Sequence, residues 1–425
     1  MARIRRQGIL PPIAALHGCP IITETENGIE VLGIGYHRVC GGRLVVGGAM
    51  PEQMALSEAV EILLDSIGEY DFATPGDTSR AIAAILTPAL KFGGLLEAHI
   101  PIFVIEADES QAGKGFFLEQ VQSIYREPAS MVTQRQGGVG SFDESLGQAL
   151  IDGRPFIQLD NIRGRIGSPY FEALLTCPLG RTVPARVPYK GEVQVRPDRF
   201  VFQLTSNGFE STRDLANRSC IIRIRKRRGF RFRRYPEGGL LSHIAANQPR
   251  YLGAVYCIVG QWVAHGKQAT TDIRGEGRFR QWAQILDWIV QQLFGLPPLM
   301  DGHEVAQERA ANPALNWLRQ VCLTAETEAR LEEPLTASGI AEMCLAHSLE
   351  IPGVSNDAPE SRAVLRIGQL MGKVFVGRQS VECDGFEILK SETTQYNEER
   401  RRDETLKKYT IQRFAPNAPC CAPCA

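Results

Sequence analysis

Four short apolar segments in the middle of the chain constrain its fold more than any other feature. Each is one strand long, is almost uninterrupted by polar residues until its end, and is separated from the next by helix-sized stretches or loops. Runs of this kind are typical of strands buried on both faces of a parallel sheet. We therefore predict an α/β unit with a mostly parallel sheet. The segments are IPIFVIEA from Ile100, RPFIQLDN from Arg154, RFVFQLTSN from Arg199 and SCIIRIR from Ser219.

A Gly-Lys pair, Gly113–Lys114, follows the first of these segments. In the pattern G-x-x-x-x-G-K-[ST], such a pair lies between a strand and a helix, and its backbone N–H groups and lysine hold phosphates. Here Asp108 replaces the first glycine and Gly115 replaces the hydroxyl residue, but an amphipathic helical pattern does follow the loop. The residues predicted to bind phosphate are Ala112, Gly113, Lys114 and Gly115.

Polar residues near the later segments agree with this loop in kind and in order. Asp160 ends the second segment, where a carboxylate can hold Mg²⁺. Asn161 follows it and can orient a water molecule, although an amide cannot take the water's proton. Asn207 ends the third segment, within reach of a γ-phosphate or of the attacking water. Arg218, with Arg213 as second choice, precedes the fourth segment, where an arginine can reach the nucleotide of a neighbouring subunit.

Taken together, these motifs resemble the helicase-type ATPase region of plasmid and phage primase-helicases. That group is related to AAA+ ATPases and to superfamily 3 and poxvirus-type helicases. The resemblance implies a P-loop, AAA+-like fold with helices on both faces of the sheet. It also implies ATP and Mg²⁺ as cofactors, and a homo-oligomer, with a hexamer as one option, that hydrolyses ATP between subunits. In such a site Lys114 binds phosphate, Asp160 holds Mg²⁺, Asn207 is the first sensor and Arg218 is the arginine finger. The matching text is TPAL, AGKGFF, PFIQLDN, LLT, TSNG, RDLANRSCIIRI and RFRQWAQILDWI.

A basic segment stands out although the formal net charge of the chain is only −1. Eight of the twelve residues from Arg223 to Arg234 are basic, and Phe230 and Phe232 lie among them. Such a run can follow a phosphate backbone while the rings stack on bases, and a solvated loop after a strand is the alternative. The residues predicted to contact nucleic acid here are Arg225, Lys226, Arg227 and Arg228.

The C-terminal region shows a helix, a second helix and then strand-like segments. The second helix, Ser361–Phe375, has apolar residues on one face and basic residues on another. This order resembles a winged-helix domain, whose second helix commonly enters the DNA major groove, and docking to protein is the competing use of that fold. The residues predicted to contact DNA here are Arg362, Arg366 and Lys373.

Composition and cysteine usage point to a cytoplasmic protein. Hydrophobic residues make up 44% and charged residues 22%, which is typical of a folded domain, and no apolar run is long enough to span a bilayer. The eleven cysteines are scattered and are expected to be mostly core residues. Two weak metal patterns exist: the tail pair Cys421 and Cys424, and a set formed on paper by His17, Cys19, His37 and Cys40.

We therefore predict an ATP-dependent DNA helicase or translocase of a mobile genetic element, acting on single-stranded DNA. The predicted regions are an N-terminal α+β region (1–95), the ATPase domain (96–300), the winged-helix-like domain (313–415) and a cysteine-containing tail (416–425). Because the first region is too short for a primase, priming would need a separate chain. Two alternatives stay open: a nucleotide-binding scaffold or regulator with weak hydrolysis, and a winged-helix replication initiator that uses ATP only to assemble.

Overall fold

The computed structural model divides the chain into two compact units, Met1–Glu304 and Val305–Ala425. It describes residues 13–26, 28–107, 109–133, 141–160, 165–187, 191–271, 279–354, 359–383, 385–397 and 402–413. The domain boundaries predicted at residues 95, 300, 313 and 415 are finer than this division and stay predictions.

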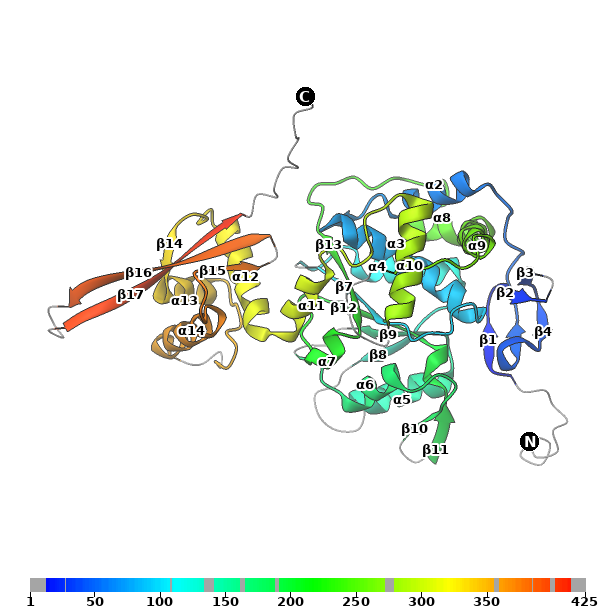
Figure 1. Cartoon of the computed structure of the whole chain (residues 1–425), viewed down its shortest axis with the longest axis horizontal. Helices are drawn as coiled ribbons and strands as arrows, with labels where there is room; N and C mark the ends of the chain where they lie inside the picture. The colour runs from blue at the N-terminus through cyan, green and yellow to red at the C-terminus, as the bar shows by residue number, and fades with distance from the viewer. Residues whose placement is uncertain are drawn as a thin grey trace, which may run out of the picture. The chain divides into compact units, whose positions relative to one another are not determined.

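A six-stranded sheet forms the centre of the first unit (Figure 1). Its strands β13, β7, β12, β9 and β8 are parallel, and β6 is an antiparallel edge strand paired with β13. The four apolar segments of the sequence are all strands of this sheet, so the predicted α/β architecture is confirmed. In spatial order the strands are β6 (Asp71–Phe72), β13 (Ser219–Arg225), β7 (Ile102–Glu106), β12 (Val201–Ser206), β9 (Phe156–Asp160) and β8 (Ser130–Thr133).

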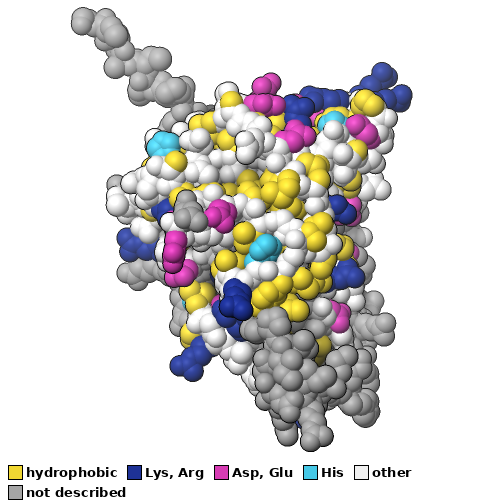
Figure 2. Space-filling view, turned by 90° about the vertical axis from the view of Figure 1, so that its right-hand side faces the viewer, with side chains coloured by type: hydrophobic (Ala, Val, Ile, Leu, Met, Phe, Trp, Pro, Cys, Tyr) yellow, Lys and Arg dark blue, Asp and Glu magenta, His cyan; other side chains and the backbone are white. Residues whose placement is uncertain are grey.

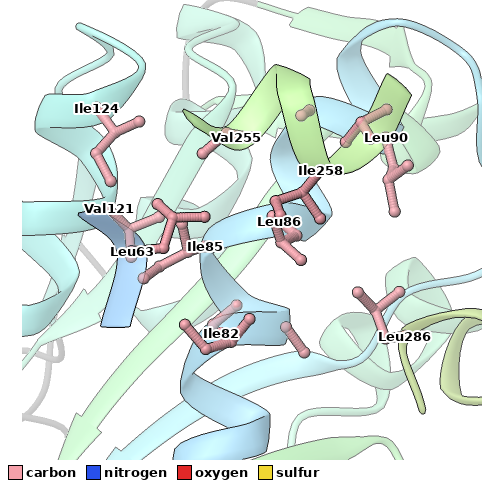
Figure 3. Close-up of a cluster of buried hydrophobic side chains, with 14 of the residues drawn as sticks. Leu63, Ile82, Ile85, Leu86, Leu90, Val121, Ile124, Val255, Ile258 and Leu286 are labelled. Carbon is pink, nitrogen blue, oxygen red and sulfur yellow. The ribbon is translucent and has the colours of Figure 1, made fainter. Parts of the chain in front are cut away.

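Helices cover both faces of this sheet, as predicted. On one face the ring of Phe103 lies 5.9 Å from that of Trp282, and the apolar side chains of several helices interlock (Figure 3). On the other face the ring of Phe202 lies 5.4 Å from that of Phe171. The first layer contains α2 (Leu56–Ile67), α3 (Pro75–Phe92), α4 (Lys114–Ile124), α9 (Gln248–Ala264) and α10 (Arg280–Phe294). The second contains α5 (Phe142–Asp152) and α6 (Pro169–Thr176), and short helices α7 (Arg213–Ala216) and α8 (Leu240–Ala246) complete the unit.

Small β-elements at the N-terminus pack against the end of α3. The Thr23 hydroxyl donates to the Gly93 carbonyl at 2.7 Å, and a Cβ on Gly93 would lie 1.6 Å from the Ile22 carbonyl oxygen, so only glycine fits there. Figure 2 views this side of the molecule, where apolar side chains gather on the surface. The elements are β1 (Ala15–His17), β2 (Ile21–Thr25), β3 (Gly28–Leu32), β4 (Gly35–His37), η1 (Val39–Gly41) and β5 (Arg43–Val45). A separate hairpin, β10 (Val183–Val187) with β11 (Gly191–Val195), precedes η2 (Pro197–Arg199) and β12.

A buried carboxyl group joins the N-terminal elements to the loop between α4 and β8. The Gly18 N–H donates to Glu127 Oε1 at 2.5 Å, and Glu127 is 8% exposed. Burial raises the pKa of Glu127 from 4.5 to about 7, although the Gly18 bond and the charge of Arg154 offset part of this rise. The folded state therefore favours the protonated carboxyl group.

This carboxyl group predicts a pH dependence of stability. Because the folded pKa of Glu127 is raised, its stabilising contribution is complete below pH 4.5 and is lost as the pH rises through about 7. We expect Glu127→Gln to remove this loss, which is on the order of 3 kcal/mol. The measurement is the free energy of urea unfolding from pH 4.5 to 8, with Glu61→Gln on the exposed side of α2 as control. Curves of wild type and Glu127→Gln that run parallel over this range would contradict the prediction.

Three helices and an antiparallel sheet make up the second unit. The sheet order is β14-β17-β16-β15, and β16 and β17 pair along their full lengths from Phe386↔Arg413 to Asn397↔Arg402. One core, which includes Trp317, Ile367 and Ile388, joins the helices to the sheet. The elements are α12 (Pro313–Thr327), β14 (Pro334–Thr336), α13 (Ala337–Ala346), α14 (Glu360–Val374), β15 (Ser380–Cys383), β16 (Phe386–Asn397) and β17 (Arg402–Arg413), and α11 (His303–Ala311) spans the division between the units.

Neither metal pattern of the sequence is seen as a site. In the part of the chain that the structure describes, no three His, Cys, Asp or Glu side chains come together as metal ligands, so His17, Cys19, His37 and Cys40 do not form a zinc set. The tail cysteines lie outside the described residues. Within the described ranges, no helix has the length and apolar character needed to cross a membrane.

Candidate nucleotide site at the strand ends

The sheet has a topological switch point between β7 and β12. The chain leaves β7 through α4 toward β8 at one edge, whereas it leaves β12 through α7 and crosses past β7 to β13 on the other side. The connections after these two neighbouring strands therefore run in opposite directions. In open α/β sheets, ligands bind outside the carboxyl ends of the strands at the point where the direction of the connections reverses.

The loop after β7 turns sharply into α4 at this point. Gly113 has φ 96°, a left-handed conformation that favours glycine, and α4 begins at the next residue. A Cβ on Gly113 would lie 3.4 Å from the ring of Tyr70, which packs beneath the loop. Among the described residues no side chain caps this helix, and its first intrahelical bond is from the Phe117 N–H to the Gly113 carbonyl. The preceding N–H groups and the positive end of the helix dipole are thus oriented as an anion requires.

Lys114 spans the switch point from its position at the start of α4. Its Nζ donates to Asn207 Oδ1 at 2.5 Å, just beyond β12, and to the Glu109 carbonyl at 3.1 Å. Burial lowers the pKa of Lys114, and the nearby Glu106 offsets part of this effect. The structure thus brings together Gly113, Lys114 and Asn207, although Lys114 and Asn207 lie 93 residues apart in the chain.

Asp160 lies at the carboxyl end of β9, the strand beside β12. The Thr205 hydroxyl of β12 donates to Asp160 Oδ1 at 2.8 Å, which holds one carboxylate oxygen in place beside the strand that leads to Asn207. Gly115 lies in the first turn of α4 with no atom within 4 Å of where a Cβ would lie, and Ala112 is half-buried. Asp108 and Asn161 lie outside the described residues.

Two cations of the basic segment (Arg223–Arg234) reach the same loop. Arg228 Nη2 lies 2.9 Å from Glu109 Oε1 and Lys226 Nζ lies 3.8 Å from Glu109 Oε2. Lys114 bonds the carbonyl of that same residue, so three cations surround Glu109. Glu109 was not predicted from the sequence, and Lys226 and Arg228 were predicted to contact nucleic acid. These contacts place both side chains beside the candidate nucleotide site as well.

The rest of the basic segment is mostly exposed and is held at two points. The Arg225 guanidinium donates to the Ala73 carbonyl at 3.0 Å, and Arg233 makes a two-bond contact with Asp65 at 2.6 and 2.8 Å. Arg227 lies over the ring of Phe230, 4.5 Å from its centroid. Phe230 and Phe232 are 40% and 63% exposed and contact each other edge to face. Solvent-facing aromatic rings between arginines form a surface on which unpaired bases can stack.

Arg218 lies at the other end of the strands. The Arg218 carbonyl accepts from the Ile102 N–H at 3.0 Å, so Arg218 is beside the beginning of β7, whereas Lys114 follows its end. At about 3.3 Å per residue, the length of β7 alone separates Arg218 from Lys114 by roughly 13 Å. The Arg218 guanidinium lies 3.4 Å from Asp214 and 3.7 Å from Glu172, and Arg213 is exposed.

In the second unit, α14 presents the predicted DNA-contacting residues. Arg362 and Lys373 are exposed, and Arg366 is half-buried because its Nε donates to the Pro352 carbonyl at 2.8 Å. Leu365 is 64% exposed on the same helix. Gly368 and Gly372 are exposed too, and a Cβ added at either position would have open space around it. A partner could therefore approach this face closely.

Comparison with solved structures finds a weak likeness to a helicase. No protein-family model matches the chain, and no curated protein matches it. A solved structure described as "SCCmec type IV Cch - active helicase" is similar at 12% sequence identity and a TM-score of 0.34, covering 97% of this chain and 82% of that chain. Because this likeness is so low, it carries no argument about function. A functional assignment therefore depends on the geometry of the site.

Proposed function

We propose that the chain is a nucleoside triphosphatase, with ATP as the expected substrate, that couples hydrolysis to moving along or unwinding DNA of a mobile genetic element. The observation that carries this proposal is the 2.5 Å contact between Lys114 and Asn207 across the switch point, next to an uncapped helix N-terminus. A lysine, a left-handed glycine and an amide then converge where a triphosphate would bind. The pattern of strand, Gly-Lys loop and helix supports a P-loop assignment.

Each residue of the site would have one role. Gly113 and the first N–H groups of α4 would bind phosphate oxygens, and Lys114 would exchange its contacts with Asn207 and Glu109 for the β- and γ-phosphates. Asn207 would then be free to orient the attacking water. Asp160, held by Thr205, is the carboxylate suited to Mg²⁺, which would neutralise phosphate charge.

Arg218 would act only in an assembly. It lies at the opposite end of β7 from Lys114, so it cannot reach the nucleotide of its own chain. As an arginine finger it would have to leave Glu172 and Asp214 for the nucleotide of a neighbouring copy. The proposal therefore includes a homo-oligomer, with a hexameric ring as one option.

Two surfaces support DNA as the partner. The basic segment offers arginines with exposed phenylalanines, which suits single strands. The face of α14 with Arg362, Leu365 and Lys373 suits a groove, and the helices and paired strands around it fit a winged-helix domain. A separate primase stays part of the proposal for any element that needs priming.

Phosphate release from Mg-ATP, with and without single-stranded DNA, tests the proposal. We expect turnover that single-stranded DNA stimulates. Nucleotide binding without turnover in either condition would favour the scaffold over the motor. Sequence-specific duplex binding that survives Lys114→Ala, without stimulated turnover, would favour the initiator.

Arg228 is expected to contribute to ATP binding. In the structure it pairs with Glu109 in the loop, and an entering triphosphate would offer it a stronger negative charge. We expect Arg228→Gln to weaken ATP binding about tenfold, as the loss of one charge-assisted hydrogen bond does. Arg231→Gln is the matched control, because it removes the same charge from the same segment. Equal ATP affinities of the two variants by calorimetry would contradict this role.

Arg227, Arg231 and Arg234 are expected to contact single-stranded DNA. Replacing all three by glutamine should lower the slope of log affinity against log salt by about 0.7 for each phosphate that the protein no longer neutralises. Fluorescence anisotropy of a labelled oligonucleotide at several salt concentrations measures this slope. Arg250→Gln, which lies outside the segment and pairs with Glu58, should leave it unchanged. An unaltered slope in the triple variant would show that the segment is merely solvated.

A further inference from the structure

Four cations lie near the amino ends of the sheet strands, whereas the candidate nucleotide site lies at the carboxyl ends. Arg43 begins β5, Lys91 lies in the last turn of α3, and Arg196 and Arg199 lie at η2, directly before β12. Asn207 follows the far end of that same strand. This cation cluster (Arg43, Lys91, Arg196 and Arg199) is therefore distinct from the surroundings of Lys114.

Backbone contacts bring Arg199 and Arg43 into one neighbourhood. The Arg199 guanidinium donates to the Ala14 carbonyl. The Ala14 N–H donates to the carbonyl of Gly42, next to Arg43, at 2.7 Å. The N-terminal strands thus hold Arg43 beside the segment that leads into β12.

Lys91 joins the cluster through the end of α3. The Cys40 sulfur lies 3.6 Å from the Gly93 carbonyl, which connects the turn before Arg43 to the residues just after Lys91. Lys91 and Asp198 line the same small cavity, of about 20 Å³. Asp198 in turn pairs with Arg196 at 2.6 Å.

The positive charges of this cluster exceed the negative ones. Among the described residues, the ion pair between Arg196 and Asp198 is the one these four cations make. Lys91 donates to the Ala98 carbonyl, and the Nε of Arg43 finds no acceptor in the described part of the chain. Yet Arg43 is only 7% and Lys91 only 9% exposed. Buried charges in proteins are normally paired, yet Arg43 and Lys91 make no ion pair with a carboxylate among the described residues.

The effects of this crowding appear in the pKa values. Burial lowers the pKa of Lys91 to about 8; Asp198 offsets part of the fall, and Arg196 and Arg43 add to it. Burial and then the charges of Arg196 and Arg43 lower the pKa of Arg199. His17 adds no charge, because burial and Arg43 lower its pKa to about 3. An anion at this place would relieve the repulsion.

We propose that the cation cluster binds the phosphate group of a small molecule. Guanidinium groups match the geometry of phosphate oxygens with paired hydrogen bonds, and lysine adds a point charge. The burial of Arg43 and Lys91 favours a ligand that enters the molecule over a polymer backbone that stays on its surface. The adjoining cavity is small and mostly apolar, so it favours a compact phosphate over a bulky ligand. Its apolar lining is Ile100, Leu174, Leu175, Leu179, Phe200 and Phe202, with Cys177 and Pro197.

Thermal unfolding in the Lys114→Ala background tests this site, because that variant removes phosphate binding through Lys114. The probes are inorganic phosphate, phenyl phosphate and a single-stranded oligonucleotide, each against chloride at equal ionic strength and pH 7. We expect both small phosphates to raise the melting temperature by about 3 °C or more. Adding Arg199→Gln or Lys91→Met should abolish the rise. Adding Arg234→Gln, an exposed arginine of the basic segment, should not.

The same series controls for folding. In chloride alone, the Arg199→Gln protein should melt no lower than its parent, because the half-exposed arginine is removed from like charges. A rise that is no larger in phosphate than in chloride, or that persists in Arg199→Gln, would overturn the proposal. Stabilisation by the oligonucleotide alone, abolished in Arg199→Gln, would overturn the small-molecule assignment in favour of a polymer phosphate. None of these results depends on the proposed ATPase activity.

Discussion

Replacing Lys114 by alanine is expected to abolish both nucleotide-dependent stabilisation and ATP turnover. Lys114 is the side chain that joins the loop after β7 to Asn207 after β12, and its charge is what a triphosphate would need at that place. A competent site stabilises the wild-type protein by about 2.7 kcal/mol at a hundredfold excess of ATP over Kd. We expect the variant to show none of this gain and no hydrolysis above background.

Lys407→Ala is the control for this experiment, since Lys407 is an exposed lysine on β17 in the other unit. It should keep the full stabilisation by ATP. Melting curves at several Mg-ATP concentrations, with phosphate release measured on the same samples, give both quantities. If ATP raised the melting temperatures of the Lys114 variant and the wild type equally, the Gly113 loop would not be the nucleotide site.

Replacing Arg80 by methionine is expected to cost about 3–5 kcal/mol of unfolding free energy, as the loss of one member of a buried ion pair does. Arg80 is 1% exposed and its partner Asp77 is fully buried. The guanidinium donates to Asp77 Oδ1 at 2.7 Å, to the Ile221 carbonyl at 2.9 Å, and to the carbonyls of Leu299 and Asp301 at 2.8 and 2.9 Å. It therefore ties α3 to β13 and to the segment after α10. Methionine would leave the Asp77 carboxylate and three carbonyl groups without this donor.

Arg250→Gln removes a comparable pair from the surface, where Arg250 and Glu58 lie 3.1 Å apart with about half of each side chain exposed. Surface pairs of this kind contribute about 0–1 kcal/mol. Urea unfolding followed by tryptophan fluorescence compares the two variants, because Trp262, Trp282 and Trp288 all lie in the first unit. Similar losses in both would mean that backbone packing, and not Arg80, holds these elements together.

Local sequence patterns predicted the elements of the first unit well. The four apolar segments became β7, β9, β12 and β13 because an uninterrupted apolar run of strand length has to be buried on both faces. The start of α4 at Lys114 was also predictable. A Gly-Lys pair between a strand and an amphipathic stretch can be recognised from neighbouring residues alone. The polar residues at strand ends could be named for the same reason.

Hydrogen-bond and ion-pair partners that depend on strand order could not be predicted from local sequence patterns. Nothing near Asp160 indicates that Thr205 would hold its carboxylate, because that hydrogen bond exists only once β9 and β12 pair in a particular register. The contacts of Lys226 and Arg228 with Glu109 require β13 to lie beside β7, more than a hundred residues away in the chain. A basic run looks the same in sequence whether it faces nucleic acid, a nucleotide loop or water.

By itself, then, the sequence determined which segments are strands and helices in the sheet unit and which residues end them, because hydrophobic periodicity and glycine conformation act over a few neighbouring residues. Tertiary structure alone decided which of those ends meet. It joined Lys114 to Asn207 and surrounded Glu109 with cations. It also brought Arg43, Lys91 and Arg199 together near the amino ends of the strands. The physical reason is that hydrogen bonds between strands and burial of side chains join residues at any separation along the chain.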